Sequence, residues 1–360
     1  MIVKSIELSD FRNYKSCRID LDCQTNIFYG DNAQGKTNIL EALYVSATTK
    51  SHKGSRDREM IRFGTEESHI RTVVEKEQEE YQLDIHLKKN SSKGIAVNRI
   101  PIRKASELCG ILNIVMFSPE DLAIIKNGPA ERRRFLDLEL CQLDKIYLME
   151  LTRYHRILNQ RNKLLKDIIY RKDLTDTLSV WDEQLFESGK KIIQTRRNFL
   201  QEIGEIVTGI HHTLSGGKEE LKVSYEPDTS EDELEKTLLQ NRERDIRYGQ
   251  TSEGPHRDDI SFFINQVDIR KYGSQGQQRC GALSLKMAEI ELVKKMIHDK
   301  PVLLLDDVLS ELDSSRQNYL LNSIHDIQTL ITCTGLDEFV KNRFSINRVY
   351  RVNKGTIEPA

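Results

Sequence analysis

The spacing of apolar residues changes in character along the chain. Near the N-terminus, short segments alternate apolar and polar residues or are rich in β-branched residues, and this pattern predicts strands at residues 2–8, 17–21 and 26–29. From about Pro129 onward, apolar residues instead recur mostly at every third or fourth position, first over residues 136–165 and again over residues 181–210. This spacing predicts two long antiparallel helices, each with one apolar stripe.

The pattern leaves the length of the first helix open. If residues 131–170 form one continuous helix, it is about 60 Å long at 1.5 Å per residue, which is an extended arm and not a buried core helix. The polar segment 159–163 interrupts the apolar stripe. Several shorter helices in a compact bundle are therefore the alternative.

Strand-like patterns return after about residue 246. S-F-F-I and V-D-I-R lie on either side of Asn265-Gln266, a helix is expected over residues 277–297, and the apolar run P-V-L-L-L at 301–305 is typical of a strand buried on both faces of a parallel sheet. A surface loop is expected before these elements, at Gly216-Gly217 and the acidic segment 219–235. The expected fold is α/β, with residues 1–117 and 246–360 in one lobe and a mostly helical second lobe at 118–245.

Composition narrows the class of protein. The 360 residues carry 54 Lys+Arg and 56 Asp+Glu, a net charge of −2, which excludes nucleic-acid binding through overall basicity but not through local patches. No apolar run approaches the ~18 residues that span a bilayer, and acidic residues interrupt the first ten positions. The six cysteines are scattered without a C-x-x-C pair. We expect a cytoplasmic protein with reduced thiols, no zinc site and no membrane contact.

A phosphate-binding motif follows the strand expected at 26–29. Residues 30–37 read G-D-N-A-Q-G-K-T, which matches G-x-x-x-x-G-K-[ST], and a helix-like segment follows. In such a loop, backbone N–H groups surround phosphate oxygens, Lys36 contributes a cation for the β- and γ-phosphates, and Thr37 contributes a hydroxyl for Mg²⁺. We therefore expect ATP and Mg²⁺ as cofactors, with nucleotide bound by Gly30, Asp31, Asn32, Ala33, Gln34, Gly35, Lys36 and Thr37.

Two further motifs fit a P-loop ATPase. V-L-L-L-D-D at 302–307 predicts a buried strand that ends in two carboxylates, with Asp306 in the Mg²⁺ shell beside Thr37 and Asp307 placed to orient or deprotonate the attacking water. Lys36, Asp306 and Asp307 are thus the expected catalytic residues. S-Q-G-Q-Q-R at 274–279 precedes a predicted helix whose N-terminus suits an anion. The residues expected to bind nucleotide there are Ser274, Gln275, Gly276 and Gln277.

The order of these motifs resembles that of ABC-type ATPases, in which the signature turn of one subunit covers the γ-phosphate held by another. A rival for the signature turn is L-S-G-G-K at 214–218. It leads into a strand-like acidic segment instead of a helix, so we interpret it as a loop. Position 307 is Asp where most ABC ATPases have Glu, which predicts slow turnover. T-C-T at 332–334 replaces the usual switch histidine, and these positions stay outside the expected catalytic set.

Several strings together resemble the RecF family of recombination-repair ATPases, which are related to SMC proteins. Besides the P-loop, the S-Q-G-Q-Q-R turn and the Asp306-Asp307 pair, they are L-S-D-F-R-N-Y at 8–14, F-S-P-E-D-L at 117–122, E-R-R-R-F-L-D at 131–137 and G-P-H-R-D-D at 254–259. The resemblance covers nearly the whole chain. It implies an ATP-dependent homodimer with weak, DNA-stimulated hydrolysis that binds DNA at single-strand/double-strand junctions and, with RecO and RecR, helps to load RecA at gaps. It also implies that Arg12 and Asn13 contact the nucleotide. The alternative is that these two residues only form a turn between two edge strands.

Three stretches are locally basic despite the balanced total. Residues 50–62 carry five Lys/Arg against two acids, residues 126–172 carry twelve against six, and residues 341–354 carry five against none. Phosphate contacts need such clusters, and we find no motif that reads base edges, so we expect little sequence preference. The ordinary alternative for any of them is a solvated face. The stretch nearest the P-loop is the favoured DNA contact, through Lys50, Lys53, Arg56, Arg58 and Arg62.

The combined expectation is an ABC-type P-loop ATPase head with a helical insertion, which closes on a second copy over two ATP molecules and grips DNA until hydrolysis releases it. Two other classes remain as alternatives. A transporter-type ABC ATPase subunit would need a coupling surface for membrane helices. An SMC-like chromosome-structural ATPase would need coiled arms far longer than the roughly 40 residues available to each helix here.

Overall fold

The structure is a computed structural model that describes residues 1–324, 326–335 and 346–360. Contacts between residues divide the chain into two units: a first unit of residues 1–122 and 286–360, and a second unit of residues 123–285. The division falls inside the helix α10 (Gln275–Ile297). Residues 246–285, which the sequence pattern groups with the ATPase lobe, therefore belong with the helical unit.

The first unit contains an antiparallel sheet whose strand order is β2-β1-β4-β5-β6-β7. Buried and less buried residues alternate along β4, because one face of an antiparallel sheet covers a core while the other meets solvent. The strands expected at the N-terminus are confirmed. The bounds are β1 Ile2–Phe11, β2 Tyr14–Asp20, β4 Glu67–Lys76, β5 Glu79–Lys88, β6 Gly94–Val97 and β7 Ile100–Pro101.

A second, mixed sheet of the first unit has the order β15-β14-β3-β13-β12-β8. Every neighbouring pair is parallel except β14 with β15. All five residues of β12 are buried, and β12 lies between parallel neighbours, so the expectation from the apolar run is confirmed. The bounds are β3 Thr25–Tyr29, β8 Ile114–Phe117, β12 Val302–Asp306, β13 Thr329–Cys333, β14 Ile346–Asn353 and β15 Thr356–Pro359.

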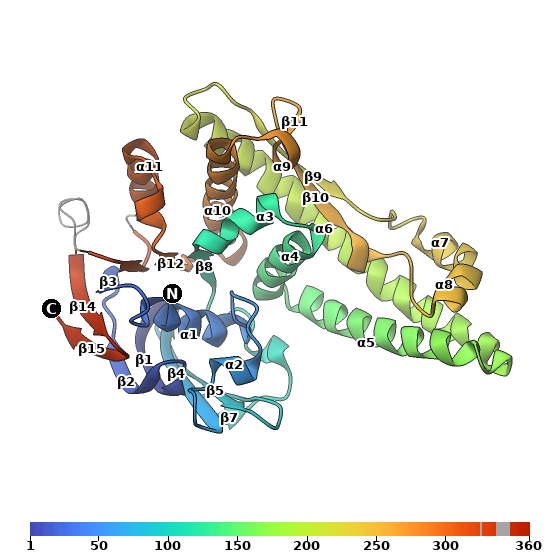
Figure 1. Ribbon diagram of the computed structural model, residues 1–360, viewed down its shortest axis with the longest axis horizontal. Helices are drawn as coiled ribbons and strands as arrows, with labels where there is room; N and C mark the ends of the chain where they lie inside the picture. Colours follow the sequence, from blue (N-terminus) through green and yellow to red (C-terminus); the bar gives the residue numbers. More distant parts are fainter. Residues whose placement is uncertain (325, 336–345) are drawn as a thin grey trace. The chain divides into compact units, whose positions relative to one another are not determined.

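The helix α1 (Lys36–Thr48) packs against strands of both sheets, and Figure 1 shows it beside β1 and β4. Its residues from Ile39 to Ala47 are all buried, which places the phosphate-binding loop at the end of a helix fixed on every side. Smaller elements complete this unit: α2 Asp57–Met60, η1 Ala105–Glu107, η2 Pro119–Asp121, η5 Val308–Glu311 and α11 Ser314–Ile324.

The second unit is built on a long helical hairpin. The helices are α4 Pro129–Leu143, α5 Lys145–Ile168 and α6 Leu178–Leu214, and α5 lies along α6 (Figure 1). The single helix over residues 131–170 is not formed, because Asp144 leaves the helical conformation and its side chain caps α5 by accepting hydrogen bonds from the amides of Ile146 and Tyr147. The second predicted helix is confirmed as one continuous element.

A three-stranded antiparallel sheet of order β11-β10-β9 covers part of α6. Two expectations need correction here. The acidic segment is not only a surface excursion, since β9 (Leu221–Glu226) lies within it and pairs with β10 (Asp259–Ile264). V-D-I-R is a strand only at β11 (Val267–Asp268) before it turns into α9 (Ile269–Tyr272). The remaining elements are α3 Leu122–Lys126, η3 Lys172–Thr177, α7 Leu234–Gln240, α8 Arg242–Tyr248 and η4 Pro255–Arg257.

Buried arginine–aspartate pairs hold this second unit together. Arg161 on α5 is fully buried and binds Asp182 and Asp245, with both distances 2.7 Å. Arg132 in the E-R-R-R string is also buried and makes two hydrogen bonds to the carboxylate of Asp259. These basic residues of the 126–172 stretch therefore fix the fold and are not available to DNA phosphates.

None of the six cysteines, all of which lie among the described residues, forms a disulfide bond. Within the described part of the chain, no helix is both long enough and apolar enough to span a membrane.

Candidate nucleotide-binding site

The phosphate-binding loop joins β3 to the N-terminus of α1, so the strand–loop–helix context expected for it is confirmed. Two of its positions accept only glycine. Gly30 has φ +151°, and a Cβ there would lie 2.3 Å from the carbonyl oxygen of Val352. Gly35 has φ +114°, and a Cβ would lie 2.4 Å from the side chain of Asn13. The loop is therefore pressed against two neighbouring segments of the first unit.

The ammonium group of Lys36 is held over the loop. Its Nζ donates to the carbonyl oxygens of Gly30 (2.6 Å) and Asp31 (2.8 Å), and the residue is only 7% exposed. These neutral acceptors satisfy the donors of the cation without neutralising its charge. Lys36 thus presents a positive charge at the N-terminal end of α1, where the helix dipole also favours an anion.

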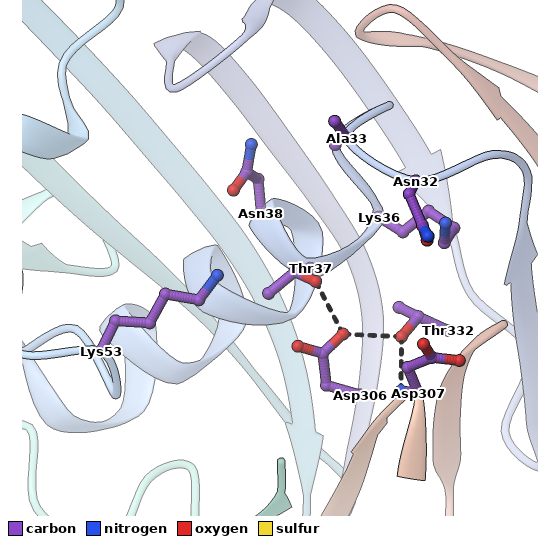
Figure 2. Close-up of a pocket in the computed structure, with 10 residues that line it drawn as sticks. Asn32, Ala33, Lys36, Thr37, Asn38, Lys53, Asp306, Asp307 and Thr332 are labelled. Atoms are coloured by element: carbon purple, nitrogen blue, oxygen red, sulfur yellow. Dashed lines mark hydrogen bonds between the residues drawn. The ribbon is translucent and has the colours of Figure 1, made fainter. Parts of the chain in front are cut away.

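Three residues form a hydrogen-bonded chain opposite the loop. The Thr37 hydroxyl donates to Oδ1 of Asp306 at 2.8 Å, and the Thr332 hydroxyl donates to the same oxygen at 2.7 Å (Figure 2). The Thr332 hydroxyl also accepts from the backbone amide of Asp307 at 3.0 Å. Asp307 follows β12 in the left-handed conformation, with φ +54°, so the chain turns sharply between the two aspartates.

These groups line one cavity of about 210 Å³. The structure thus brings together five of the expected P-loop residues and the two carboxylates, whereas Gly30, Asp31 and Gln34 are not part of the cavity lining. It adds Asn38, Thr332 and Lys53. Figure 2 shows Lys53 on the segment after α1. The sequence suggested DNA for Lys53, whereas its position makes its charge available to a nucleotide. The full set of lining residues is Asn32, Ala33, Gly35, Lys36, Thr37, Asn38, Lys53, Asp306, Asp307 and Thr332.

The donor set fits a magnesium ion that relies on phosphate and water for most of its ligands. Thr37 and Asp306 offer a hydroxyl and a carboxylate oxygen 2.8 Å apart, and Mg²⁺ in nucleotide sites takes one or two such protein oxygens and keeps several waters. Among the described residues, no group of three or more His, Cys, Asp or Glu side chains could hold a metal on its own.

Arg12 and Asn13 lie beside the loop, in the turn between β1 and β2. The Arg12 guanidinium binds both carboxylate oxygens of the buried Glu41 at 2.6 and 2.7 Å. Burial alone would raise the pKa of Glu41, but hydrogen bonds from Arg12 and Ser51 outweigh it and lower that pKa. Asn13 donates to the carbonyl oxygen of Gln34 and accepts from Asn38. Asn13 therefore supports the loop directly, Arg12 is held on Glu41 of α1, and the contact of either residue with nucleotide stays a prediction.

The S-Q-G-Q-Q-R turn belongs to the second unit, at the start of α10. The Ser274 hydroxyl accepts from the amide of Gln277 at 3.2 Å, and the Gln277 side chain accepts from the amide of Ser274 at 3.0 Å. This reciprocal pair is a capping box. It leaves the first turn of a 23-residue helix open toward solvent, because Ser274, Gln275 and Gly276 are all exposed.

The rival turn at 214–218 lies at the C-terminal end of a helix, whereas the S-Q-G-Q-Q-R turn lies at an N-terminal end. It follows the C-terminal end of α6, where the left-handed Gly216 (φ +65°) and Gly217 (φ +77°) end the helix and the Gly217 amide donates to the carbonyl oxygen of His212. A helix C-terminus presents carbonyl oxygens, which repel phosphate. The interpretation as a loop fits this geometry.

The basic segment 50–62 lies on the first unit. Lys50, Lys53, Arg56 and Arg58 are exposed, and none of them forms an ion pair with any described residue. Arg62 differs, because it is half-buried and lies 3.6 Å from Asp10. The segment therefore offers four uncompensated cations and one that is partly neutralised.

A second basic segment on the same unit was not recognised in the sequence. Residues 88–104 contain six Lys/Arg and no acid, and they form the outer edge of the antiparallel sheet at β6 and β7. Lys93 donates to Asp57 and to the carbonyl oxygen of Thr49, which fastens this edge to the 50–62 segment. Arg99, Arg103 and Lys104 are exposed and without ion pairs to described residues. A charge count over these positions would have found the segment, and only the structure shows that the two segments are neighbours.

Comparisons with known proteins place these features in a family. A model of the RecF/RecN/SMC N-terminal domain matches residues 2–358. The chain is 65% identical over 99% of both chains to a DNA replication and repair protein RecF of Agathobacter rectalis. It is 45% identical to the RecF of Clostridium botulinum, over 99% of this chain and 100% of the relative.

Solved structures agree with the sequence comparison. The recombination mediator protein RecF-ATP of the RecFOR pathway superimposes with a TM-score of 0.94 at 34% identity, over 100% of this chain and 97% of the other. An Smc head domain from Pyrococcus furiosus shares the fold alone, with a TM-score of 0.57 at 16% identity over 100% of this chain and 96% of the other. The expected α/β fold of an ABC-type ATPase head is thereby confirmed. The chain belongs to the RecF family within the RecF/RecN/SMC group.

Proposed function

We propose that this protein binds ATP and Mg²⁺ at the P-loop cavity and uses slow hydrolysis as a switch for binding DNA in replication and repair. One observation carries the proposal: the Lys36 cation and the Thr37–Asp306–Thr332 hydroxyl and carboxylate groups converge on one cavity of about 210 Å³. The similarity to a RecF-ATP structure at 34% identity supports the choice of nucleotide.

Each group in the cavity has a chemical role in this proposal. Lys36 exchanges its loop carbonyls for β- and γ-phosphate oxygens, and Thr37 and Asp306 bind Mg²⁺. Asp307 orients or deprotonates the attacking water, and its short side chain accounts for slow turnover. Lys53 adds a second positive charge near the phosphates. A Mg²⁺ ion held by Thr37 and Asp306 would supply positive charge for the phosphate oxygens.

A second copy of the chain completes the site. We assign Lys36, Thr37, Asp306 and Asp307 to one copy, and Ser274 and Gly276 to its partner. The open first turn of α10 supports this assignment, because its capping box orders the turn while free backbone N–H groups and the helix dipole attract the γ-phosphate. ATP would then hold two copies together, and hydrolysis would release them.

DNA binds, in this proposal, to the first unit across the two basic segments. Lys50, Arg56, Arg58 and Arg62 form one half, while Lys53 faces the nucleotide cavity, and Arg99, Arg103 and Lys104 at the sheet edge form the other half. Contacts of this kind reach phosphates and not base edges, so the interface favours DNA form over sequence. The family resemblance extends this proposal to a single-strand/double-strand junction at a gap, where RecO and RecR would cooperate in loading RecA. The relatives, which are DNA replication and repair proteins RecF, and the neighbour of the RecFOR pathway support the repair setting alone.

The nucleotide part is tested by molecular mass in solution with ATP and Mg²⁺, with and without gapped duplex DNA. We expect a monomer that becomes a dimer with ATP in the parent protein and in Asp307→Asn, but not in Lys36→Met or Ser274→Arg. Asp307→Asn should keep the dimer longer, since it binds without hydrolysing. A monomer under every condition, with DNA binding indifferent to ATP, would refute the composite site.

The DNA part is tested by the salt dependence of binding to gapped DNA. Arg103→Ala and Lys104→Ala should each lower the slope of log K against log salt concentration by about 0.9, the value for one lost phosphate contact. Lys15→Ala is the matched control, because Lys15 is exposed without an ion pair to described residues and lies on β2, at the opposite edge of the same sheet. Equal slopes for all three variants would mean that the β6–β7 edge does not touch DNA.

A further inference from the structure

The last hairpin of the chain contacts the phosphate-binding loop directly. Lys354 and Gly355 form the two-residue turn between β14 and β15, and both have positive φ, +45° and +76°. The Lys354 amide donates to Oε1 of Gln34 at 2.7 Å, and the Gly355 amide donates to the Gln34 carbonyl oxygen at 3.1 Å. Gln34 is thus tied to the other end of the sequence through both its side chain and its backbone.

The same carbonyl oxygen receives a second donor. Nδ2 of Asn13 donates to it at 2.8 Å, and Asn38 in turn donates to Oδ1 of Asn13. Two N–H groups from segments that do not line the cavity therefore hold the Gln34 carbonyl on the side away from it, and Gln34 itself is outside the lining. A trans peptide is planar, with its C=O and N–H pointing in opposite directions. Fixing the Gln34 carbonyl outward consequently aims the amide of Gly35, a residue that lines the cavity, inward.

Sterics show how tightly the turn fits. A Cβ on Gly355 would lie 2.5 Å from the backbone oxygen of Asn13, a distance that real side chains do not reach. The first glycine of the loop is held from the same hairpin, since Gly30 faces the Val352 carbonyl. The hairpin therefore touches the loop at both of its ends, and no side chain can be inserted without moving one or the other.

We propose that the Lys354–Gly355 turn is a positioning element for ATP binding: it orients the Gln34–Gly35 peptide so that the Gly35 amide can donate to a phosphate oxygen. The inference rests on the proposed nucleotide function of the loop. The turn acts through Gln34 and does not touch the Thr37–Asp306–Thr332 chain. It therefore sets the affinity for ATP and leaves the hydrolytic groups in place.

The test compares Gly355→Ala with Gly64→Ala. Gly64 is the matched control, because it has a similar positive φ (+88°) in the same unit but nothing within 4 Å of the added Cβ. Both variants place an alanine at a positive φ, and only Gly355→Ala meets a neighbour. We expect the Kd and KM for ATP of Gly355→Ala to rise about tenfold, the effect of one hydrogen bond to a charged acceptor. The kcat at saturating ATP should stay within about twofold of that of Gly64→Ala, since the hydrolytic groups are untouched.

A merely structural role gives a different result. It would lower the unfolding temperature and the fraction of active protein, so kcat would fall while KM stayed unchanged, and that outcome would overturn the proposal. An unchanged Kd would overturn it as well. Lys354→Asn separates position from charge, because Asn-Gly also favours this turn type. We expect it to bind ATP like the parent, and a tenfold loss would show that the lysine charge, and not the turn, sets affinity.

Two further variants keep the proposal testable if Gly355→Ala does not fold or if the loop does not bind ATP. If Gly355→Ala does not fold, Gln34→Ala removes the acceptor of the Lys354 amide without adding a clash, and a rise in Kd over Gly64→Ala is again expected. Parent-like affinity in Gln34→Ala would then overturn the proposal. Lys36→Met tests the underlying function. If the parent and Lys36→Met bind ATP equally weakly, the nucleotide function itself has failed, whereas loss in Lys36→Met with none in the turn variants refutes the positioning role alone.

Discussion

Replacing Thr332 by valine removes one hydroxyl from the centre of the site and little else. Valine has nearly the same shape, and Thr332 is 2% exposed on the buried strand β13. The lost hydroxyl donates to Oδ1 of Asp306 at 2.7 Å and accepts from the amide of Asp307 at 3.0 Å. The change therefore loosens both carboxylate residues while leaving the P-loop untouched.

The size of the effect follows from these two bonds. A hydrogen bond to a charged group contributes about 1.5–3 kcal/mol, whereas a bond between neutral groups contributes about 1 kcal/mol. The Asp307 amide keeps a longer contact of 3.3 Å to the Thr332 carbonyl oxygen, so only part of the second contribution is lost. We expect the free energy of unfolding to fall by about 2–3 kcal/mol. The lost hydrogen bonds also no longer hold Asp306 in position for hydrolysis. Since about 1.4 kcal/mol corresponds to a factor of ten in rate, we expect hydrolysis to slow by at least about tenfold.

Thr329→Val is the control, since Thr329 lies on the same strand, is 1% exposed, and its hydroxyl donates only to the carbonyl oxygen of Ile327 at 3.0 Å. Urea unfolding and steady-state ATP hydrolysis at saturating ATP and Mg²⁺ should be measured for both variants. Both should be less stable, and only Thr332→Val should lose hydrolysis, by about tenfold or more. Equal hydrolysis in the two variants would refute the idea that this hydroxyl positions the aspartates.

Three further predictions concern other parts of the chain. Arg161→Met should lower the free energy of unfolding by about 3–5 kcal/mol, because the carboxylates of Asp182 and Asp245 would stay buried beside an apolar side chain. Thermal unfolding measures this loss, and a change below about 1 kcal/mol would contradict the prediction. Burial lowers the pKa of His256 to about 4, below the ordinary 6.5, so the unfolded chain takes up a proton first as pH falls and stability should decrease between pH 6.5 and 4. His256→Gln should reduce that slope in pH-dependent urea unfolding, and an unchanged slope would assign the dependence to other groups. Ser215→Ala should leave ATP-dependent dimerisation intact and Ser274→Ala should weaken it; the reverse result would make 214–218 the signature turn.

Features encoded in contiguous residues could be predicted without the fold. The P-loop is a run of eight residues whose glycine spacing and terminal Lys-Thr determine where N–H groups, ammonium and hydroxyl lie. The run at 302–307 likewise predicted a strand buried on both faces that ends in two carboxylates. The helix cap at Asp144 was not predicted. An aspartate directly before a helical stripe is a signal for a helix start, but the apolar spacing continues on both sides of Asp144, so the pattern did not indicate a break there.

Other features depend on residues that only folding brings together. Thr332 is 26 positions from Asp306, and its role arises because β12 and β13 are parallel neighbours in register. Counting charges along the sequence also overestimated the basic surface of the 126–172 stretch, since Arg132 is buried and paired with Asp259 in the fold. A pattern along the chain cannot reveal these pairings, because it contains no information on strand order or on which charges are neutralised.

The sequence by itself determined the class of this protein, its nucleotide motif and most of its elements, because each of these is a property of neighbouring residues and of their hydrogen-bonding and apolar periodicity. The tertiary structure decided how the loop is held. Asn13, Gln34 and Gly355 converge from both ends of the chain, and the β6–β7 edge joins the 50–62 segment through Lys93. Contacts over such separations exist only once the sheets have formed, since strand pairing and not local sequence sets the distances between them.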